Sequence, residues 1–342
     1  MKKPVIAYLY NVRHNYPDPN DPKTQLEVDY DDPSTIDCMI DHFKQCGYDV
    51  LPIEADEHAF AKLKRNRKRI TMTYNYSLGL SGQDRYAQFP SILEMLEIPY
   101  TGSRPLVQAI VQNKPMMKDV LIANDIPTLR YQIFYTGTEM LDQRLKFPLI
   151  VKPVSQGSSA GITNSSVVND EDELRKQLST VMSLFHTPAF VEPFITGREF
   201  SLGMLGNPPH FLPIVEADHT SLPEGYLPLD SLEVKWIIEE QAPNHLVCPA
   251  KIDARTKAML EDVCLRSWHA LGIQDLCRID VRMDDEGNPF VLDVNSPCGM
   301  IPPEVSMTSY FPLEARAAGI DYNTLLQAII GHALQRYGKK LS

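Results

Sequence analysis

The sequence predicts an α/β protein whose first third is an open parallel sheet and whose remainder mixes strands and helices in an α+β arrangement. Near the N-terminus, two apolar runs at residues 5–10 and 48–53 flank a helical segment with one apolar face, which is the pattern of a β-strand, helix, β-strand unit. Later, strand-like runs around residues 278–281 and 290–295 are joined by a turn sequence, which predicts an antiparallel hairpin. A chain of 342 residues with 43% hydrophobic residues is long enough to bury two or three cores.

Composition and charge exclude several classes of function. The formal net charge of −11 disfavours nonspecific nucleic-acid binding. No apolar run approaches the roughly 20 residues that span a bilayer, and the N-terminus has no apolar signal-peptide segment. The six cysteines are scattered and form no CxxC pair, which is typical of reduced thiols in a cytoplasmic protein. The basic run at residues 62–69 is interpreted as a solvated helix end.

The elements divide into three predicted domains, at residues 1–104, 105–189 and 190–342. In the first, a polar insertion at residues 11–32 is unusually long for a loop and is therefore expected to be functional or mobile. A helix follows, with Ser34 as its N-cap and Asp37 in its first turn. The loop after the strand at residues 70–74 lies at the sheet edge where ligands of open α/β sheets gather. The other predicted elements are helices at residues 91–97, 106–111, 114–124, 171–184, 251–271 and 321–337 and strands at residues 132–135, 149–153, 189–192 and 197–204.

A lysine followed by a glycine-rich loop is the most informative local pattern. Lys152 ends a buried strand, and Gly157, Ser158, Ser159 and Gly161 follow it. Polyphosphate needs both a fixed cation and a flexible loop of backbone N–H donors that can approach closely. The alternative is an ordinary Ser/Gly hairpin between two strands.

Four polar residues on the later hairpin form the second constellation. Arg278 and Asp280 lie two apart on one strand, and Asp293 and Asn295 lie two apart on the next, so all four are expected on one face. Two carboxylates and an amide oxygen suit Mg²⁺, which shares its coordination with substrate phosphates. A surface hairpin with exposed acids remains the alternative.

Other candidates are weaker when taken singly. Glu192 and Glu199 fit salt-bridge or capping roles, and Lys235, in a strand-like run, fits a solvated lysine. The sequence has no HExxH metal motif, no G-x-S-x-G elbow and no G-x-x-x-x-G-K-[ST] loop, which argues against a serine hydrolase or a P-loop protein.

The order and spacing of these motifs resemble the ATP-grasp superfamily and, within it, the D-alanine–D-alanine ligase group. The resemblance covers nearly the whole chain. It is carried by residues 99–103, Lys114, residues 152–162, 191–195 and 197–199, Lys235, residues 278–280 and 293–295, and residues 312–319. It implies an ATP-grasp fold with an N-terminal open parallel-sheet domain.

The resemblance also implies a role for each candidate. Lys114 and Lys152 would hold the nucleotide phosphates, and Glu192, Phe194 and Ile195 would clasp the adenine, with Glu199 on the ribose. The loop of Gly157, Ser158, Ser159 and Gly161 would fold over the γ-phosphate near Lys235. Ser158 would also take part in catalysis. Asp280, Asp293 and Asn295 would carry two Mg²⁺ ions, which Mn²⁺ can replace. Arg278 and the Gly299 N–H would stabilise an oxyanion, and Ser309 would hold the carboxylate of the second substrate.

Departures from the group's pattern concern the amino-acid side of the site. The insertion at residues 11–32 replaces a Glu-containing turn, and residues 75–85 lack the histidine of the group. Trp236 stands where a tyrosine is usual, Asp293 where a glutamate is usual, and residues 302–305 are extra. The nucleotide half is therefore expected to be intact and the amino-acid half to be rebuilt.

The function predicted from the resemblance is an ATP-dependent carboxylate–amine ligase that forms an amide or dipeptide bond through an acyl phosphate. Its substrates are expected to be a small-molecule carboxylate and a small-molecule amine, both amino acids other than the cell-wall pair. Two alternatives remain, a D-alanine–D-alanine ligase of peptidoglycan synthesis and a catalytically silent ATP-binding regulatory protein. Arg278 argues against the silent protein, which has no need of an oxyanion arginine. A cytoplasmic location, no nucleic-acid or membrane partner and a homodimer complete the expectations, together with two mobile lids at residues 157–161 and 223–243.

Overall fold

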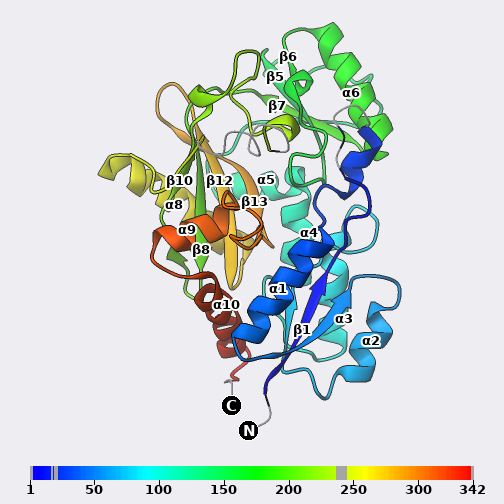
Figure 1. Cartoon of the computed structure of the whole chain (residues 1–342). Helices are drawn as coiled ribbons and strands as arrows, with labels where there is room; N and C mark the ends of the chain where they lie inside the picture. Colours follow the sequence, from blue (N-terminus) through cyan, green and yellow to red (C-terminus); the bar gives the residue numbers. More distant parts are fainter. Residues whose placement is uncertain (1–2, 17, 19–21, 236–244, 340–342) are drawn as a thin grey trace.

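The computed structural model describes residues 3–16, 18, 22–235 and 245–339, and it contains three sheets (Figure 1). The first sheet is parallel with strand order β2-β1-β3, formed by β1 (Val5–Tyr10), β2 (Asp49–Glu54) and β3 (Met72–Asn75). The predicted open parallel sheet is confirmed.

Alternating side chains of β1 bury both faces of this sheet. Ile6 and Tyr8 face a core shared with α1 (Pro33–Gln45) and α10 (Tyr322–Arg336). Ala7 and Leu9 face a second core shared with α2 (Ala59–Asn66) and α3 (Gln88–Met95). One of the two covering layers therefore includes the final helix of the chain.

The start of α1 differs from the prediction. Pro33 is the first helical residue and Asp32 is the N-cap, without a side-chain capping bond, so Ser34 lies inside the helix and Asp37 lies beyond its first turn. Proline suits this first position because its missing N–H would have no helical partner there. The Asp32 carboxylate instead accepts a hydrogen bond from Arg13 Nη1 at 3.0 Å.

The second sheet is antiparallel and has strand order β4-β7-β5-β6. Its strands are β4 (Gln132–Phe134), β5 (Leu149–Pro153), β6 (Val167–Val168) and β7 (Ala189–Pro193). Helix α6 (Glu171–Phe185) packs on it and closes a small core. Strand β7 pairs with β5, so this sheet extends to residue 193, beyond the predicted domain boundary at residue 189. The division into domains stays a prediction.

The third sheet has six antiparallel strands. Five run in the order β11-β10-β8-β12-β13, and β9 pairs with β8. Their bounds are β8 (Glu199–Leu205), β9 (His210–Phe211), β10 (Val215–Ala217), β11 (Leu246–Val247), β12 (Leu276–Met283) and β13 (Pro289–Asn295). Helices α4 (Pro105–Gln112), α5 (Lys114–Ala123) and α8 (Ala254–Leu271) share a core with this sheet, and α9 (Tyr310–Ala317) packs against β8.

Short 3₁₀ turns complete the description, at η1 (Pro22–Glu27), η2 (Arg85–Ala87), η3 (Asn164–Ser166) and η4 (His219–Ser221). The basic run forms the end of α2 and the turn after it, and most of its side chains are exposed, as predicted. Within the described ranges, no helix is long and apolar enough to cross a membrane.

Candidate active site

One cavity is lined by residues of the second and third sheets and by loop residues of the N-terminal part, such as Tyr76 and Leu78 directly after β3. Among its lining residues are Lys114, Lys152, Gly157, Ser158, Ser159, Glu192, Phe194, Ile195, Glu199, Lys235, Arg278, Asp280, Asp293, Asn295 and Gly299. The structure therefore brings together fifteen of the seventeen residues named from the sequence. Gly161 and Ser309 do not line the cavity.

The β12–β13 hairpin places four polar residues on one face. Arg278 pairs with Asn295 and Asp280 pairs with Asp293 in the antiparallel register. Two guanidinium nitrogens of Arg278 donate to the two carboxylate oxygens of Asp280 at 2.9 and 2.8 Å, and Asn295 Nδ2 donates to Asp280 at 2.8 Å. Burial alone would raise the pKa of Asp280, but Arg278 outweighs it, so the pKa is lowered and the carboxylate stays ionised.

The same hairpin offers hard oxygen ligands. Asn295 donates through its nitrogen to Asp280, which leaves its amide oxygen for another partner. Asp293 Oδ2 lies 2.5 Å from Lys114 Nζ, and its side chain is 28% exposed. Two carboxylates and one amide oxygen beside a lysine fit a Mg²⁺ ion that shares phosphate oxygens with that lysine. The surface-hairpin alternative is not supported, because these side chains line the cavity.

A buried ion triad lies at the edge of the cavity. Lys152 Nζ and Lys118 Nζ each lie 2.7 Å from a carboxylate oxygen of Glu192. Glu192 and Lys118 are fully buried, whereas the Lys152 side chain is 12% exposed toward the cavity. Burial would raise the pKa of Glu192, but the two lysines lower it to about 2.

The triad changes how Glu192 is interpreted. The Glu192 carboxylate is paired with two lysines. Contact with adenine therefore stays a prediction, and it would be made by the backbone of residue 192 and by Phe194 and Ile195. Sequence reasoning missed Lys118, although its spacing was informative. It lies four residues after Lys114, and residues at that spacing share one face of a helix.

The glycine-rich loop has the backbone expected of an anion-binding turn. Ser158 and Ser159 have positive φ angles of 46° and 62°, and the Ser158 side chain is exposed. Successive residues in this region turn their N–H groups toward one side. Gly161 is a packing residue instead, because a Cβ there would lie 2.5 Å from the Phe185 ring.

The long insertion contacts this loop. The Gly157 N–H donates to Asp29 at 3.2 Å, and the Gly161 N–H donates to Gln25 Oε1 at 2.9 Å. Arg13 stabilises the end of the insertion by donating hydrogen bonds to the Asp32 carboxylate and to the Val28 carbonyl, both at 3.0 Å. The described part of the insertion thus packs against the loop, and its Asp29 lines the cavity.

Asp29 carries further polar partners from the N-terminal domain. Arg85 Nη2 and the Tyr86 hydroxyl each lie 3.4 Å from its carboxylate, and Tyr86 also lines the cavity. Residues 75–85 were expected to line the substrate pocket, and Tyr76 and Leu78 do so. The sequence marked the insertion as functional, but nothing in it distinguished Asp29 from the other acidic residues nearby.

Asp230 joins three elements around the cavity. Its carbonyl accepts from the Ser159 hydroxyl at 2.6 Å, and its carboxylate contacts His219 at 3.1 Å and the Tyr310 hydroxyl at 2.5 Å. Burial would raise the pKa of Asp230, but His219 and Lys235 lower it well below its usual range. The Tyr310 ring in turn packs on Arg278, with 4.7 Å between the guanidinium and the ring centroid.

Glu199 is held by a second arginine that the sequence did not single out. Arg282 Nη2 lies 2.9 Å from Glu199, and Arg282 Nη1 donates to the Ile195 carbonyl at 3.0 Å. Arg282 is buried and also donates to the Pro228 carbonyl. It lies four residues after Arg278 on β12, so alternation along the strand was the available signal.

Lys235 lies in a helical turn rather than a strand, and its Nζ is 4.0 Å from Asp230. The segment from residue 223 to 243 was expected to be a mobile lid. In its described part Leu229, Leu232 and Val234 are buried, so this part is docked in the structure. The Leu232 N–H also donates to the Ile162 carbonyl at 2.8 Å. Trp236 and the rest of the expected lid lie outside the described residues.

Ser309 holds the loop beside Gly299. Its hydroxyl accepts from the Ile301 N–H at 3.2 Å, and the Met300 N–H donates to the Tyr76 hydroxyl at 2.8 Å. Binding of a substrate carboxylate by Ser309 stays a prediction.

Comparisons with known proteins agree with this geometry. A family model described as the D-ala D-ala ligase C-terminus matches residues 120–331. The chain belongs to the D-alanine–D-alanine ligase family. It is 29% identical to a D-alanine–D-alanine ligase of Pelotomaculum thermopropionicum over 89% of this chain and 92% of that protein. It is 31% identical to an uncharacterised protein, y4sG, of Sinorhizobium fredii over 94% of this chain and 92% of that protein.

A solved structure supports the same family assignment. The D-alanine–D-alanine ligase of Bacillus anthracis, crystallised with ATP, superposes with a TM-score of 0.73 at 25% identity and covers 98% of both chains. The fold is therefore the ATP-grasp fold, and the chain is an ATP-grasp ligase of the D-alanine–D-alanine ligase-like group. The donor set described above fits the cofactors of that group, ATP and Mg²⁺.

Proposed function

We propose that this ligase joins the carboxylate of one amino acid to the amine of another and consumes one ATP for each bond formed. The observation that carries the proposal is the convergence of two constellations in one cavity. The polar face of β12–β13 lines the same cavity as Lys114, Lys152 and the glycine-rich loop, and Lys114 contacts Asp293 of that face. The first constellation suits metal and oxyanion chemistry, and the second suits a polyphosphate.

Each group then has a defined task. A carboxylate oxygen of the first substrate attacks the γ-phosphorus of ATP, and ADP leaves. Lys114, Lys152 and the loop N–H groups hold the phosphates in line, so positioning and fixed charge supply most of the acceleration. Mg²⁺ bound by Asp280, Asp293 and Asn295 would offset the negative charge on the transferring group.

The second step uses the other end of the hairpin. The amine of the second substrate attacks the acyl phosphate carbon, a proton leaves the nitrogen, and inorganic phosphate departs. Arg278 and the Gly299 N–H both line the cavity beside this position and would stabilise the oxyanion. The number of metal ions and the use of Mn²⁺ stay predictions.

Two substrate pairs are candidates. A pair of D-alanines is the first to test, because the relatives named above carry that activity in their names. Other amino acids are the second candidate. They are favoured by the wall of Asp29 and Tyr86 and by the absence of a histidine from residues 75–85.

Release of ADP from MgATP in the presence of single and paired D- and L-amino acids tests the proposal, with mass spectrometry of the product. Arg198→Gln is a matched control, because Arg198 forms an exposed ion pair with Glu216. Amino-acid-dependent ADP release with a dipeptide product supports the ligase. Release that no amino acid stimulates contradicts it, and a dominant D-Ala–D-Ala product removes the second candidate. A homodimer and a cytoplasmic location stay predictions.

A further inference from the structure

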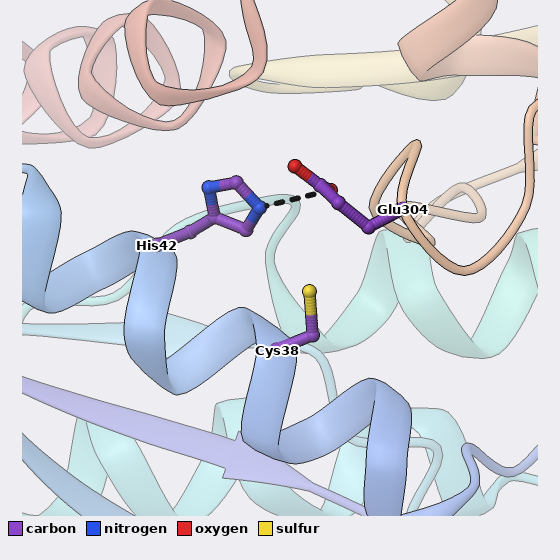
Figure 2. Close-up of side chains that lie close together, drawn as sticks. All are labelled: Cys38, His42 and Glu304. Carbon is purple, nitrogen blue, oxygen red and sulfur yellow. Dashed lines mark hydrogen bonds and ion pairs between the residues drawn. The ribbon is translucent and has the colours of Figure 1, made fainter.

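A second group of metal-ligating side chains lies outside the active-site cavity, between α1 and the loop after β13. It consists of Cys38, His42 and Glu304, whose Sγ, imidazole nitrogen and carboxylate oxygen all lie within 4.8 Å of one another. Figure 2 shows Cys38 and His42 on successive turns of α1, with Glu304 reaching toward them from the opposite loop. Because the two α1 residues are four apart, the helix itself places them on one face.

The hydrogen bonds of His42 determine which of its nitrogens faces the group. Asn323 donates through Nδ2 to Gln45 Oε1 at 3.1 Å, so its Oδ1 is the atom that faces His42 Nδ1 at 2.8 Å. The proton of a neutral imidazole therefore belongs on Nδ1, and Nε2 presents a lone pair. A histidine ligand held through its other nitrogen by an oxygen acceptor is the usual arrangement at metal centres.

That lone pair faces a carboxylate. His42 Nε2 and Glu304 Oε2 are 3.2 Å apart. Two acceptors at this distance repel unless a cation lies between them, either a proton on Nε2 or a metal ion. In a tetrahedral zinc site, ligand distances of roughly 2.0 Å place nitrogen and oxygen about 3.3 Å apart, close to the separation observed.

Cys38 distinguishes between the two cations. An imidazolium–carboxylate pair needs no sulfur, whereas a thiolate, an imidazole and a carboxylate together are a set that Zn²⁺ favours over Mg²⁺ or Ca²⁺. We propose that Cys38, His42 and Glu304 bind one Zn²⁺ ion, with water as the fourth ligand. The exposed side of Glu304 provides the path for the ion and the water.

The proposed ion would join two parts of the active site's surroundings. Helix α1 packs against the N-terminal sheet. The loop that carries Glu304 also contains Met300 and precedes Ser309, both beside the cavity. Zinc binding would therefore restrain this loop against the N-terminal domain, whatever substrate the ligase uses.

Zinc titration of the metal-free full-length protein against a chromophoric zinc indicator, with excess Mg²⁺ and ADP present to occupy the catalytic cavity, tests the proposal. We expect one site per chain and a rise of several degrees in Tm with zinc. Co²⁺ in place of Zn²⁺ should give a sulfur-to-cobalt charge-transfer band. Cys38→Ser should remove that band and weaken zinc binding at least ~10-fold.

Two further variants keep the test independent of folding. Glu304→Gln changes a side chain that is 59% exposed, so the fold should remain while zinc affinity falls at least ~10-fold. Cys248→Ser alters a half-buried thiol elsewhere and should leave zinc binding unchanged. Equal zinc affinity in the wild type and Glu304→Gln, or no site in the wild type, would overturn the proposal and leave a protonated His42–Glu304 pair.

Discussion

Charged residues of the cavity are neutralised by one another before any nucleotide binds. Asp280 is matched by Arg278, Asp293 by Lys114, and Glu192 by two lysines. A bound polyphosphate and its metal would therefore exchange these internal partners for external ones. Because folding already fixes the positions of these charged groups, little free energy is spent on orienting them during the reaction.

The clearest single-residue test of catalysis is Asp293→Asn. The amide keeps an oxygen acceptor for Lys114 but removes the charge that would bind the metal, so we expect turnover to fall at least ~10²-fold. The side chain is 28% exposed, so Tm should stay within a few degrees of the wild type. Steady-state ADP release and calorimetry measure the two effects, and unaltered turnover would remove Asp293 from the metal site.

A different outcome is expected at the buried triad. Lys118→Met removes one of two cations from a carboxylate that is fully buried, and the loss of a partner from a buried ion pair costs about 3–5 kcal/mol of unfolding free energy. Urea unfolding measures this loss. The matched control is Lys257→Met, whose exposed pair with Glu261 should contribute less than about 1 kcal/mol. Equal destabilisation by both changes would contradict the role given to burial.

The triad also limits what Lys152→Ala and Asp280→Ala can show. A phosphate-binding lysine and a metal-binding carboxylate that faced only solvent could be replaced without loss of stability. In the structure each is ion-paired and at most 15% exposed, so either change should lower stability as well as activity.

Residues were predictable from the sequence where a local pattern carried them and unpredictable where a long-range contact did. The alternation along β12 and β13 and the glycine-rich loop after Lys152 identified most of the cavity. Asp29 and Asp230 act through partners up to 128 residues away, and no local spacing reveals such pairs.

At the scale of elements, the insertion at residues 11–32 and the glycine-rich loop fit closely against each other. A Cβ on Gly157 would lie 2.9 Å from an Asp29 carboxylate oxygen, so a larger residue would force the Asp29 side chain or the loop to move. The order of secondary-structure elements was predictable, but this contact was not, because the insertion has no regular periodicity.

Gly157→Ala should therefore displace the loop from the insertion and raise the KM for ATP. Removal of the obstructing carboxylate in the double variant Gly157→Ala/Asp29→Ala should restore part of the loss, since the two sites are in contact and their effects should not add. Kinetics of the two single variants and the double variant measure the coupling. Strictly additive effects would show that the two elements act independently.

A carboxyl group of helix α9 is buried against strand β8. Glu314 is fully buried, and a Cβ on Gly203 would lie 1.8 Å from its Oε2, so it occupies the space that glycine leaves open. Burial raises the pKa of Glu314 well above its usual range, and Arg278 offsets only part of that effect. The carboxyl is therefore neutral in the folded protein at a pH where it ionises in the unfolded chain.

This difference predicts a pH dependence of stability. Below the unfolded pKa of about 4.3 both states are protonated, and as pH rises above it only the unfolded state loses the proton, so folding stability falls until the folded pKa is reached. Glu314→Gln removes that slope. Its Tm relative to the wild type should rise between pH 5 and pH 8, and a difference that does not change with pH would contradict a neutral Glu314.

For the whole molecule, closure of the cavity depends on segments that dock on each other. The Leu232 N–H donates a hydrogen bond to the Ile162 carbonyl, and Asn164 Nδ2 donates one to the Gly225 carbonyl at 2.8 Å. The buried Leu229 joins the small core beneath them. The structure thus shows a docked arrangement of the glycine-rich loop and residues 223–235.

Hydrogen exchange tests whether this docking responds to nucleotide. Both segments should gain amide protection together on addition of MgADP, because exclusion of water protects an acyl phosphate from hydrolysis. Residues 199–205 of β8 are an internal control that should change little. Full protection of both segments in the nucleotide-free protein would show that neither is a lid.

The shared core of α1 and α10 has a consequence for the birth of the protein on the ribosome. The strands of the N-terminal sheet are translated early, yet Ile6, Tyr8 and Met72 share a core with α10, which follows every other described element in the sequence. Until residues 322–336 leave the exit tunnel, that face of the sheet lacks part of its cover. Until then the apolar face of the newly made sheet is more open to intermolecular contacts than it is in the folded protein.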